Sequence, residues 1–210
     1  ISTGKRQLWG IHEGVDGTCY ACGEAGTVLV LEGDQWRALP APSELNVHCL
    51  WDTGNGLFAA GQHGRIYRYD GSDWQLHYDL HLDLTILGLW GSAPDDLYAV
   101  GDEGLILHYD GLGWKRMPSG TQSALYGLYG WGQDRLLAVG DFGLVLRYNG
   151  RDWAELDPFR VARERGATGA LSFAASTRER LTQPLRALER QQEALRAAAV
   201  RRPAPPHPPE

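Results

Sequence analysis

Two of the three cysteines form a motif that can bind a metal or exchange a disulfide, Cys19-Tyr20-Ala21-Cys22. A later segment, Leu97-Tyr98-Ala99-Val100, has the same two middle residues and has aliphatic residues at both cysteine positions. Residues three apart on a strand point to opposite faces, so the two thiols would not converge on one ion. We therefore expect buried structural thiols at Cys19, Cys22 and Cys49, with no metal site and no cofactor.

Histidines are the second candidate for metal chemistry, and their richest cluster is His77-Tyr78-Asp79-Leu80-His81-Leu82-Asp83. The other histidines of the first 156 residues are His12, His48, His63 and His108. None of them shows the spacing of a zinc site. We expect the cluster to be a polar loop and not a metal centre.

A sequence motif that recurs four times indicates which structural elements contain these cysteines and histidines. Each copy has a turn bounded by two glycines, followed by a tryptophan. The copies are Gly23, Gly26 and Trp36; Gly61, Gly64 and Trp74; Gly101, Gly104 and Trp114; and Gly140, Gly143 and Trp153. Successive tryptophans are 38, 40 and 39 residues apart, a period typical of a β-propeller blade with four short strands.

The third repeat predicts four strands, at 87–91, 97–100, 105–109 and 114–117. The segments between them contain Gly, Pro or Asp, and we expect the glycines to supply the positive φ of tight turns. The strands are almost continuously apolar because both faces of a blade pack on neighbouring blades. The recurring tryptophan is expected to wedge between blades.

The fold prediction is therefore all-β, a β-propeller of four recognisable four-stranded blades with repeats of about 39 residues. The blades are expected at about residues 6–40, 45–78, 85–118 and 123–157, in a domain spanning 1–157. Residues 158–180 are predicted to be a linker and 203–210 a disordered Pro-rich end. Leucines seven apart, at Leu181, Leu188 and Leu195, predict an amphipathic α-helix over 181–202.

Charge is distributed unevenly along the chain. From Asp157 onward there are ten Arg, no Lys and six Asp or Glu, which gives this segment a net charge of +4. The whole chain has a net charge of −6, so the first 156 residues have a net charge of −10. An acidic propeller argues against nucleic acid as a partner, because phosphates require clustered Lys and Arg. No apolar run is long enough to predict a membrane span.

The compartment can be predicted only loosely. An odd cysteine count and the lack of a visible signal peptide favour the cytoplasm. The chain begins Ile1-Ser2-Thr3 without Met, so it can be a processed product or a fragment.

The stretch from Tyr98 to Gly111, Tyr-Ala-Val-Gly-Asp-Glu-Gly-Leu-Ile-Leu-His-Tyr-Asp-Gly, is followed by Trp114. It resembles the repeats of bacterial WD40/YVTN/BNR-like propellers, which include the Asp-box proteins and the Ycf48-like photosystem assembly factors. The resemblance covers about residues 6–157. The Asp-box is shortened here to Tyr109-Asp110-Gly111-Leu112-Gly113-Trp114, which favours a role in a hairpin. The resemblance implies a binding or scaffolding platform.

Some Asp-box propellers are glycosidases that use an arginine triad, a tyrosine nucleophile and an acidic partner. No such set can be placed here, and no carboxylate pair can be assigned from spacing. The candidate arginines, Arg65, Arg68, Arg116 and Arg147, fall on predicted strands. We therefore expect no enzymatic activity, and no catalytic residue is assigned.

Four blades lie at the small end of the propeller range, and no strand is left over to close a ring by exchange between the first and last blades. Three arrangements are open: a compact four-bladed ring, half of a dimeric ring, and part of a longer propeller. An unclosed terminal blade would expose an apolar face. Self-association through such blades, or through the tail helix, is thus one kind of partnership that the sequence allows.

The turns between second and third strands and the loops between blades are expected on one rim. This rim collects acidic residues with aromatic ones among them: Glu24, His63, Tyr78, His81, Asp83, Asp102, Glu103, Asp141 and Phe142. We predict a non-enzymatic protein-interaction or assembly scaffold that binds another protein, of basic charge, at this rim. A carbohydrate-binding propeller is the alternative, and an Asp-box glycosidase is the third reading.

Overall fold

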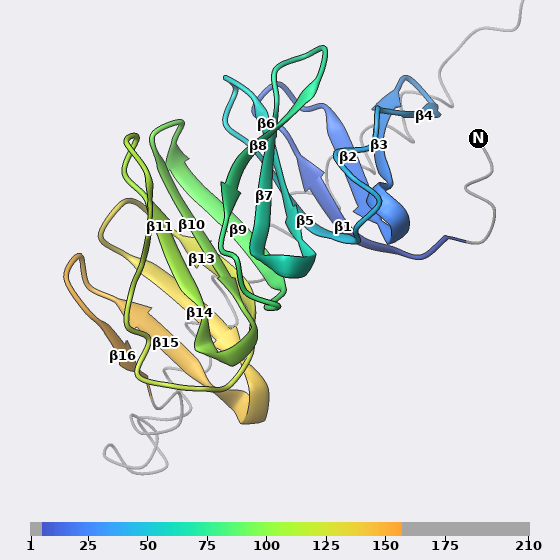
Figure 1. The fold of residues 1–210 in the computed structure, drawn as a ribbon. Coiled ribbons are helices and arrows are strands. Elements are labelled where there is room, and N and C mark those ends of the chain that lie inside the picture. Colours follow the sequence, from blue (N-terminus) through green and yellow to red (C-terminus); the bar gives the residue numbers. More distant parts are fainter. Residues whose placement is uncertain (1–5, 157–210) are drawn as a thin grey trace, which may run out of the picture. The chain divides into compact units, whose positions relative to one another are not determined.

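A computed structural model describes residues 6–156, in which sixteen strands form four antiparallel sheets (Figure 1). In every sheet the four strands follow chain order, so each sheet is a simple meander. The prediction of an all-β chain with four four-stranded repeats is therefore confirmed. The predicted linker, amphipathic helix and Pro-rich end, over 158–210, lie outside the described residues.

We name the four sheets blades 1 to 4 in chain order. Blade 1 contains β1 (Leu8–Glu13), β2 (Cys19–Gly23), β3 (Val28–Glu32) and β4 (Gln35–Ala38). Blade 2 contains β5 (Val47–Asp52), β6 (Leu57–Gly61), β7 (Arg65–Tyr69) and β8 (Trp74–Asp79). Blade 3 contains β9 (Ile86–Ala93), β10 (Asp96–Gly101), β11 (Ile106–Tyr109) and β12 (Trp114–Arg116). Blade 4 contains β13 (Leu125–Gly130), β14 (Leu136–Gly140), β15 (Val145–Tyr148) and β16 (Trp153–Glu155).

The apolar core is divided among the spaces between consecutive blades. Phe58 and Ile66 of blade 2 meet Ile86 and Leu105 of blade 3, and all four are buried. Similar clusters lie between blades 1 and 2 and between blades 3 and 4. Because an inner blade packs on both neighbours, its second strand is buried throughout, as in β10. This explains why the strands read as continuously apolar in the sequence.

The first strands of the blades lie next to one another. β1 packs on β5, β5 on β9, and β9 on β13. Within residues 6–156 no comparable contact joins β13 to β1, so the stack of four blades is open at both ends (Figure 1). Blades 1 and 4 therefore each have one face without a neighbouring blade among the described residues.

The turn between the second and third strands of every blade is a short 3₁₀ turn. These turns are η1 (Glu24–Gly26), η2 (Gln62–Gly64), η3 (Asp102–Gly104) and η4 (Asp141–Gly143). The glycine that ends each turn has a positive φ, for example 67° at Gly104, as expected. The glycine that precedes each turn does not, because Gly101 has φ −174°. It is required for another reason: a Cβ on Gly101 would lie 2.0 Å from the carbonyl oxygen of Thr85.

Three of the four repeat tryptophans lie between blades. Trp114 is 9% exposed, and its Nε1–H donates to Nδ1 of His77 in blade 2 at 3.0 Å. Trp74 donates in the same way to the carbonyl oxygen of Pro40, at 2.7 Å. Trp153 belongs to the cluster between blades 3 and 4. Trp36 is half-buried, and no described blade precedes it.

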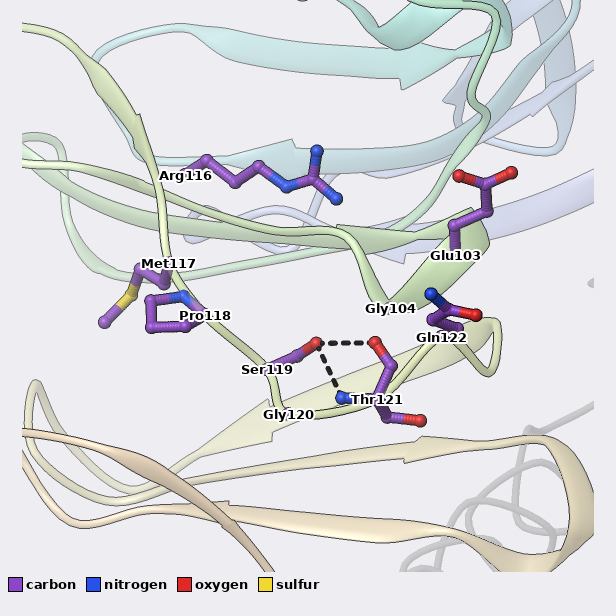
Figure 2. Close-up of a pocket in the computed structure, with 9 residues that line it drawn as sticks. All are labelled: Glu103, Gly104, Arg116, Met117, Pro118, Ser119, Gly120, Thr121 and Gln122. Atoms are coloured by element: carbon purple, nitrogen blue, oxygen red, sulfur yellow. Dashed lines mark hydrogen bonds between the residues drawn. The ribbon is translucent and has the colours of Figure 1, made fainter.

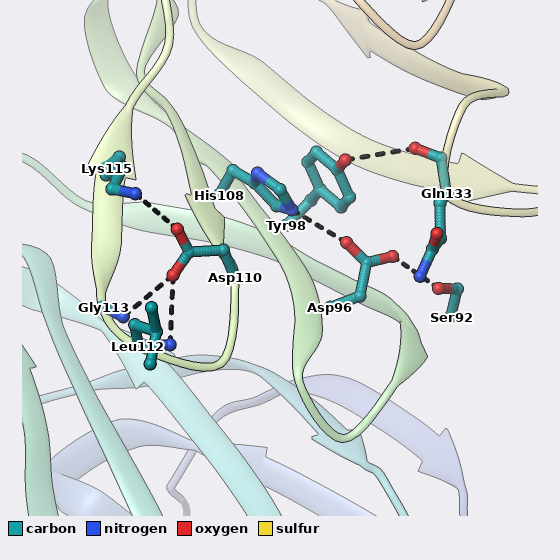
Figure 3. Close-up of polar contacts among 9 residues, drawn as sticks. All are labelled: Ser92, Asp96, Tyr98, His108, Asp110, Leu112, Gly113, Lys115 and Gln133. Carbon is teal, nitrogen blue, oxygen red and sulfur yellow. Dashed lines mark hydrogen bonds and ion pairs between the residues drawn. The ribbon is translucent and has the colours of Figure 1, made fainter.

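The turn between the third and fourth strands is held by one acidic or amide side chain. In blade 3, Oδ1 of Asp110 accepts the backbone N–H groups of Leu112 and Gly113 at 3.0 and 3.1 Å (Figure 3). A hydrogen bond from Lys115, together with these N–H groups, lowers the pKa of Asp110 to about 2. Asp70 and Asn149 cap the equivalent turns of blades 2 and 4. The shortened box therefore holds a hairpin in these blades.

We predict that Trp114→Ala lowers the free energy of unfolding by about 3–5 kcal/mol, because it empties the space between blades 2 and 3. Trp131→Ala is the matched control, since Trp131 is 59% exposed and its loss should change stability by less than about 0.5 kcal/mol. Urea unfolding measures both. Equal effects of the two substitutions would contradict the wedge role.

We also predict that the protein loses stability as the pH falls below about 6.5. Burial lowers the pKa of His77, and the charge of Arg68 lowers it further, so the folded state favours the neutral imidazole that accepts from Trp114. Burial also lowers the pKa of His12 and of His48. A group whose pKa is lower in the folded than in the unfolded state contributes stability above the unfolded pKa, and this is lost as the pH falls. Urea unfolding at pH 7.5 and 5.5 should show a smaller loss in His77→Gln than in the unmodified protein.

Candidate functional site

The four 3₁₀ turns share one edge of the blade stack with the loops that join successive blades (Figure 1). We call this edge the turn rim; it comprises η1 to η4 and the loops at residues 39–46, 80–85 and 117–124. Each turn packs beside the first strand of the next blade: η1 on β5, η2 on β9 and η3 on β13. The turns therefore form a row that follows the order of the blades.

The structure places the nine predicted rim residues on or beside this edge. Six lie in the turns: Glu24, His63, Asp102, Glu103, Asp141 and Phe142. Tyr78 lies in β8, and His81 and Asp83 lie in the loop after it. One ion pair joins two members of the set, between Nδ1 of His63 and Oδ1 of Asp83 at 2.9 Å.

Three of the predicted acidic residues are engaged within the chain. Oδ2 of Asp102 accepts the backbone N–H of Thr85 at 2.9 Å, and Oε2 of Glu24 accepts that of Gln7 at 3.2 Å. Oδ1 of Asp141 accepts the hydroxyl of Tyr126 at 2.7 Å. These carboxylates fasten a turn to the beginning of the first strand in their own blade. The sequence-based prediction did not separate these hydrogen-bonded carboxylates from the other acidic residues of the rim.

The middle residue of each turn has a left-handed backbone conformation. Ala25, His63, Glu103 and Phe142 all have φ between 52° and 57°. Such left-handed backbone is unfavourable for residues other than Gly, Asn and Asp, and it recurs at functional sites. Phe142 is fully exposed, which is unusual for so large an apolar side chain.

A row of side chains beside the rim was missed by the sequence analysis. Every first strand contains a β-bulge in which one extra residue lies unpaired: Trp9, His48, Leu87 and Tyr126. We call these four residues the bulge row. The rings of Trp9 and His48 stack with their centres 4.7 Å apart and 9° between their planes. Trp9 and Tyr126 are 42% and 53% exposed.

Electrostatic effects connect the bulge row to the turns. The pKa of His48 is lowered by burial, while the carboxylate of Asp102 acts in the opposite direction. The pKa of Tyr126 is raised first by its hydrogen bond to Asp141 and also by the charge of Asp102. Asp102 in η3 is thus close enough to influence both bulge residues. Together the turns and the bulge row combine aromatic rings, imidazoles and carboxylates at one edge.

Two pockets lie between a turn and the loop that follows the same blade. The pocket of blade 3 has a volume of about 520 Å³ and includes Glu103, Arg116, Met117 and Gln122 in its lining (Figure 2). The pocket of blade 2 has about 470 Å³, and its lining is Leu45, His63, Arg65, Asp79, His81, Leu82 and Asp83. The arginines come from a third and a fourth strand, so no local motif in the sequence indicates them.

A buried polar network joins blades 3 and 4 away from these pockets. Asp96 is 6% exposed, and its carboxylate pairs with Ser92 and, at 2.8 Å, with Nε2 of His108 (Figure 3). The ring of Tyr98 stacks on His108, and its hydroxyl donates to the carbonyl oxygen of Gln133 at 3.1 Å. His108 therefore packs on Tyr98, and the hydroxyl of Tyr98 makes the hydrogen bond to blade 4.

The three cysteines lie in strands of blades 1 and 2. Cys22 and Cys49 are buried in the core, and Cys19 is half-buried. Burial raises the pKa of Cys22 to about 12 and raises that of Cys49 well above its ordinary value. A buried, protonated thiol is a poor nucleophile and a poor metal ligand. Within residues 6–156, no three His, Cys, Asp or Glu side chains come together in a way that could hold a metal ion, and no helix is long and apolar enough to cross a bilayer.

No protein-family model matches the chain, and no curated protein matches it either. Solved structures do. Ycf48 from Cyanidioschyzon merolae is 15% identical with a TM-score of 0.59, over 68% of this chain and 51% of that one. A structure of Ycf48 bound to a D1 peptide is 20% identical with a TM-score of 0.57, over 66% and 49% of the two chains.

The chain has a β-propeller fold. At these identities the likeness shows the fold alone. The chain spans about half the length of the two structures that it resembles. The predicted likeness to Ycf48 propellers holds at the level of the fold.

The structure predicts different roles for two neighbouring acidic residues. Asp102→Ala should lower the free energy of unfolding by about 1–3 kcal/mol, because the N–H of Thr85 loses a charged acceptor. Glu103→Ala should change it by less than about 0.5 kcal/mol, since Glu103 is exposed. Chemical denaturation of both variants measures the difference. Equal losses would mean that Glu103 is also structural and is not available to a partner.

Proposed function

We propose that this chain is a non-enzymatic module that binds another protein on its turn rim and acts as an interaction or assembly scaffold. The observation that carries the proposal is the pair of neighbouring pockets, in blades 2 and 3, on an edge that also presents exposed aromatic rings. The likeness to a propeller whose solved structure contains a bound peptide supports the same function.

Two exposed rings, one on the turn rim and one in the bulge row, have the character of protein-binding anchors. Phe142 has a left-handed backbone conformation and its side chain is exposed to solvent. The ring of Trp9 stacks on the ring of His48. Aromatic residues dominate the energy of protein interfaces because they bury a large apolar area with few rotatable bonds. A partner that covers these rings would gain that area.

The charge of the partner follows from the carboxylates that the chain does not use itself. Glu103 is exposed, and the side chain of Asp83 is 90% exposed although it meets His63. These two groups belong to the adjoining pockets of blades 3 and 2. A partner segment with Lys or Arg side chains would place one cation near each of them. Glu24, Asp102 and Asp141 would act indirectly, by holding their turns in place.

A repeated sugar site fits the rim less well than a protein does. A lectin-like propeller would present a similar pocket in each blade, but the bulge row carries indole, imidazole, isobutyl and phenol groups in turn. The two pockets also differ, since one is lined by Glu103 and Arg116 and the other by two histidines, Arg65 and two aspartates. Four different blade edges suit a partner without internal repetition.

Selection of random displayed peptides on the full chain tests the proposal. Enriched peptides should combine Lys or Arg with an aromatic residue. Fluorescence anisotropy with a selected peptide should show binding about tenfold weaker for the double variant Asp83→Lys plus Glu103→Lys. The control is Asp95→Lys plus Asp134→Lys, the same change of charge at exposed turns between first and second strands.

The outcomes separate the candidate functions. Affinity that falls only with the rim variant supports a protein partner on the turn rim. Equal affinity in both double variants would contradict the rim. Failure to select any peptide, with binding to a glycan array instead, would favour the carbohydrate reading.

A further inference from the structure

The outer face of blade 4 is built like a face that packs on another blade. Tyr129 in β13 and Val139 in β14 are 59% and 47% exposed. By strand register they correspond to Trp90 and Val100 of blade 3, which are 7% and 0% exposed because blade 4 covers them. The residue types are those of a core position, but no described blade lies against them.

The outer face of blade 1 shows the complementary pattern. Leu8 and Ile11 in β1 are 46% and 76% exposed. The corresponding residues of blade 2 are Val47 and Leu50, which are 3% and 5% exposed and belong to the cluster between blades 1 and 2. Leu8 and Ile11 therefore occupy the positions with which a blade packs on the preceding one.

In three of the four first strands the residue after the bulge is a glycine, and in two of them the next blade approaches that glycine closely. A Cβ on Gly10 would lie 2.8 Å from the carbonyl oxygen of His48, and one on Gly88 would lie 3.3 Å from that of Tyr126. Gly127 is the equivalent residue of blade 4, but a Cβ there would meet only Val139 of the same blade. Blade 4 thus has, like blades 1 and 3, a glycine at the position that the next blade approaches, although no described strand lies against it; blade 2 has Cys49 there.

At each of the three interfaces between described blades, the residue types at two contacting positions depend on each other. A ring at the fifth residue of each first strand meets the sixth residue of the next blade's first strand. A Cβ on Gly91 would lie 2.9 Å from the indole of Trp51, and a Cβ on Gly130 would lie 2.7 Å from the indole of Trp90, so neither position has room for a side chain. Between blades 1 and 2 the ring is that of His12, whose Nε2 accepts the N–H of Asp52 at 2.9 Å.

The sets of residues at these two positions leave one ring and one acidic residue unmatched. The bulky indoles face glycine, and the smaller imidazole faces a residue that carries a side chain, whose backbone N–H it accepts. The remaining ring is Tyr129 on the outer face of blade 4, and the remaining sixth position is Glu13 on the outer face of blade 1. Tyrosine is smaller than tryptophan and glutamate carries a side chain, so this pair follows the size relation of His12 with Asp52, and the outer faces complement each other there.

We infer that the outer face of blade 4 docks on the outer face of blade 1 in a second copy of this chain, with Tyr129 against Glu13. Two copies make this contact twice, head to tail. Head-to-tail contacts close into a ring when the rotation between units permits it. Two copies supply eight blades, which is within the range of propellers. The contact continues the series of interfaces that already joins blades 1 to 4.

Molar mass in solution tests this inference on the full chain. Light scattering after size exclusion should give twice the 23.2 kDa of one chain. Ile11→Glu blocks only the blade 1 face and Val139→Glu only the blade 4 face, so each variant alone should be monomeric. Mixed together, the two variants retain one intact pair of faces and should associate. Leu112→Glu is the matched control because Leu112 is 95% exposed on a turn, and it should remain dimeric.

Each other result overturns the inference. A monomeric parent chain at high micromolar concentration would mean that these faces are covered by something other than a second copy. A dimer that survives both substitutions would place the interface elsewhere. A mixture that is no heavier than its separate components would rule out head-to-tail contact, and open-ended growth with concentration would rule out the closed ring.

A swap tests the Tyr129–Glu13 pair itself. Tyr129→Trp should weaken self-association about tenfold, because an indole does not fit opposite a glutamate side chain. Adding Glu13→Gly should restore association, since it recreates the tryptophan–glycine pair of two internal interfaces. The circular dichroism of each variant checks that the blades are folded. No recovery in the double variant would show that these residues do not face each other.

Discussion

The arrangement of the blades depends on a backbone contact that recurs once in each repeat. The first residue of every 3₁₀ turn donates its N–H to the carbonyl oxygen just before the first strand of its blade. The four bonds run from Glu24 to Gln7, Gln62 to Asn46, Asp102 to Thr85, and Asp141 to Ala124, at 2.9 to 3.2 Å. The two segments approach so closely that the residue before the turn cannot carry a side chain. The contact fixes where the chain enters each blade, and hence where the preceding blade ends.

This contact also explains how the rim can be both rigid and polar. The first turn residue is fastened through its backbone, and in Glu24 and Asp102 through its carboxylate as well. The next residue is then turned outward by its left-handed conformation. Within one turn, structural and exposed side chains are therefore immediate neighbours, as Asp102 and Glu103 illustrate. The rim therefore has fewer carboxylates available to a partner than its count of acidic residues in the sequence indicates.

The fold could be predicted from the sequence because several levels of information agree. The repeat period, the glycine positions and the recurring tryptophan each indicate a four-stranded blade, and the strands begin and end within a few residues of the expected positions. The site could be predicted only in part. Glu24 and Glu103 look alike in sequence, and their difference arises from a hydrogen bond to a residue seventeen positions earlier in the chain.

Other parts of the site have no local signature. A bulge adds one residue to a strand without changing its composition, so Trp9 and Tyr126 read as ordinary strand residues. Arg116 reaches its pocket from the end of β12, a position that only the three-dimensional arrangement reveals. The nine-residue rim and the domain ranges remain predictions, as does everything expected beyond Leu156.

The middle turn position has a consequence for how such a protein can diversify. Within this single chain it holds a methyl group, an imidazole, a carboxylate and a phenyl ring, all on nearly the same backbone. Left-handed backbone costs an ordinary non-glycine residue about 1–2 kcal/mol. None of these four side chains is branched at Cβ, so exchanging one of them for another changes this cost little. The packing of the core does not depend on which side chain occupies this position. The scaffold can thus acquire a new surface one side chain at a time, with its stability left intact.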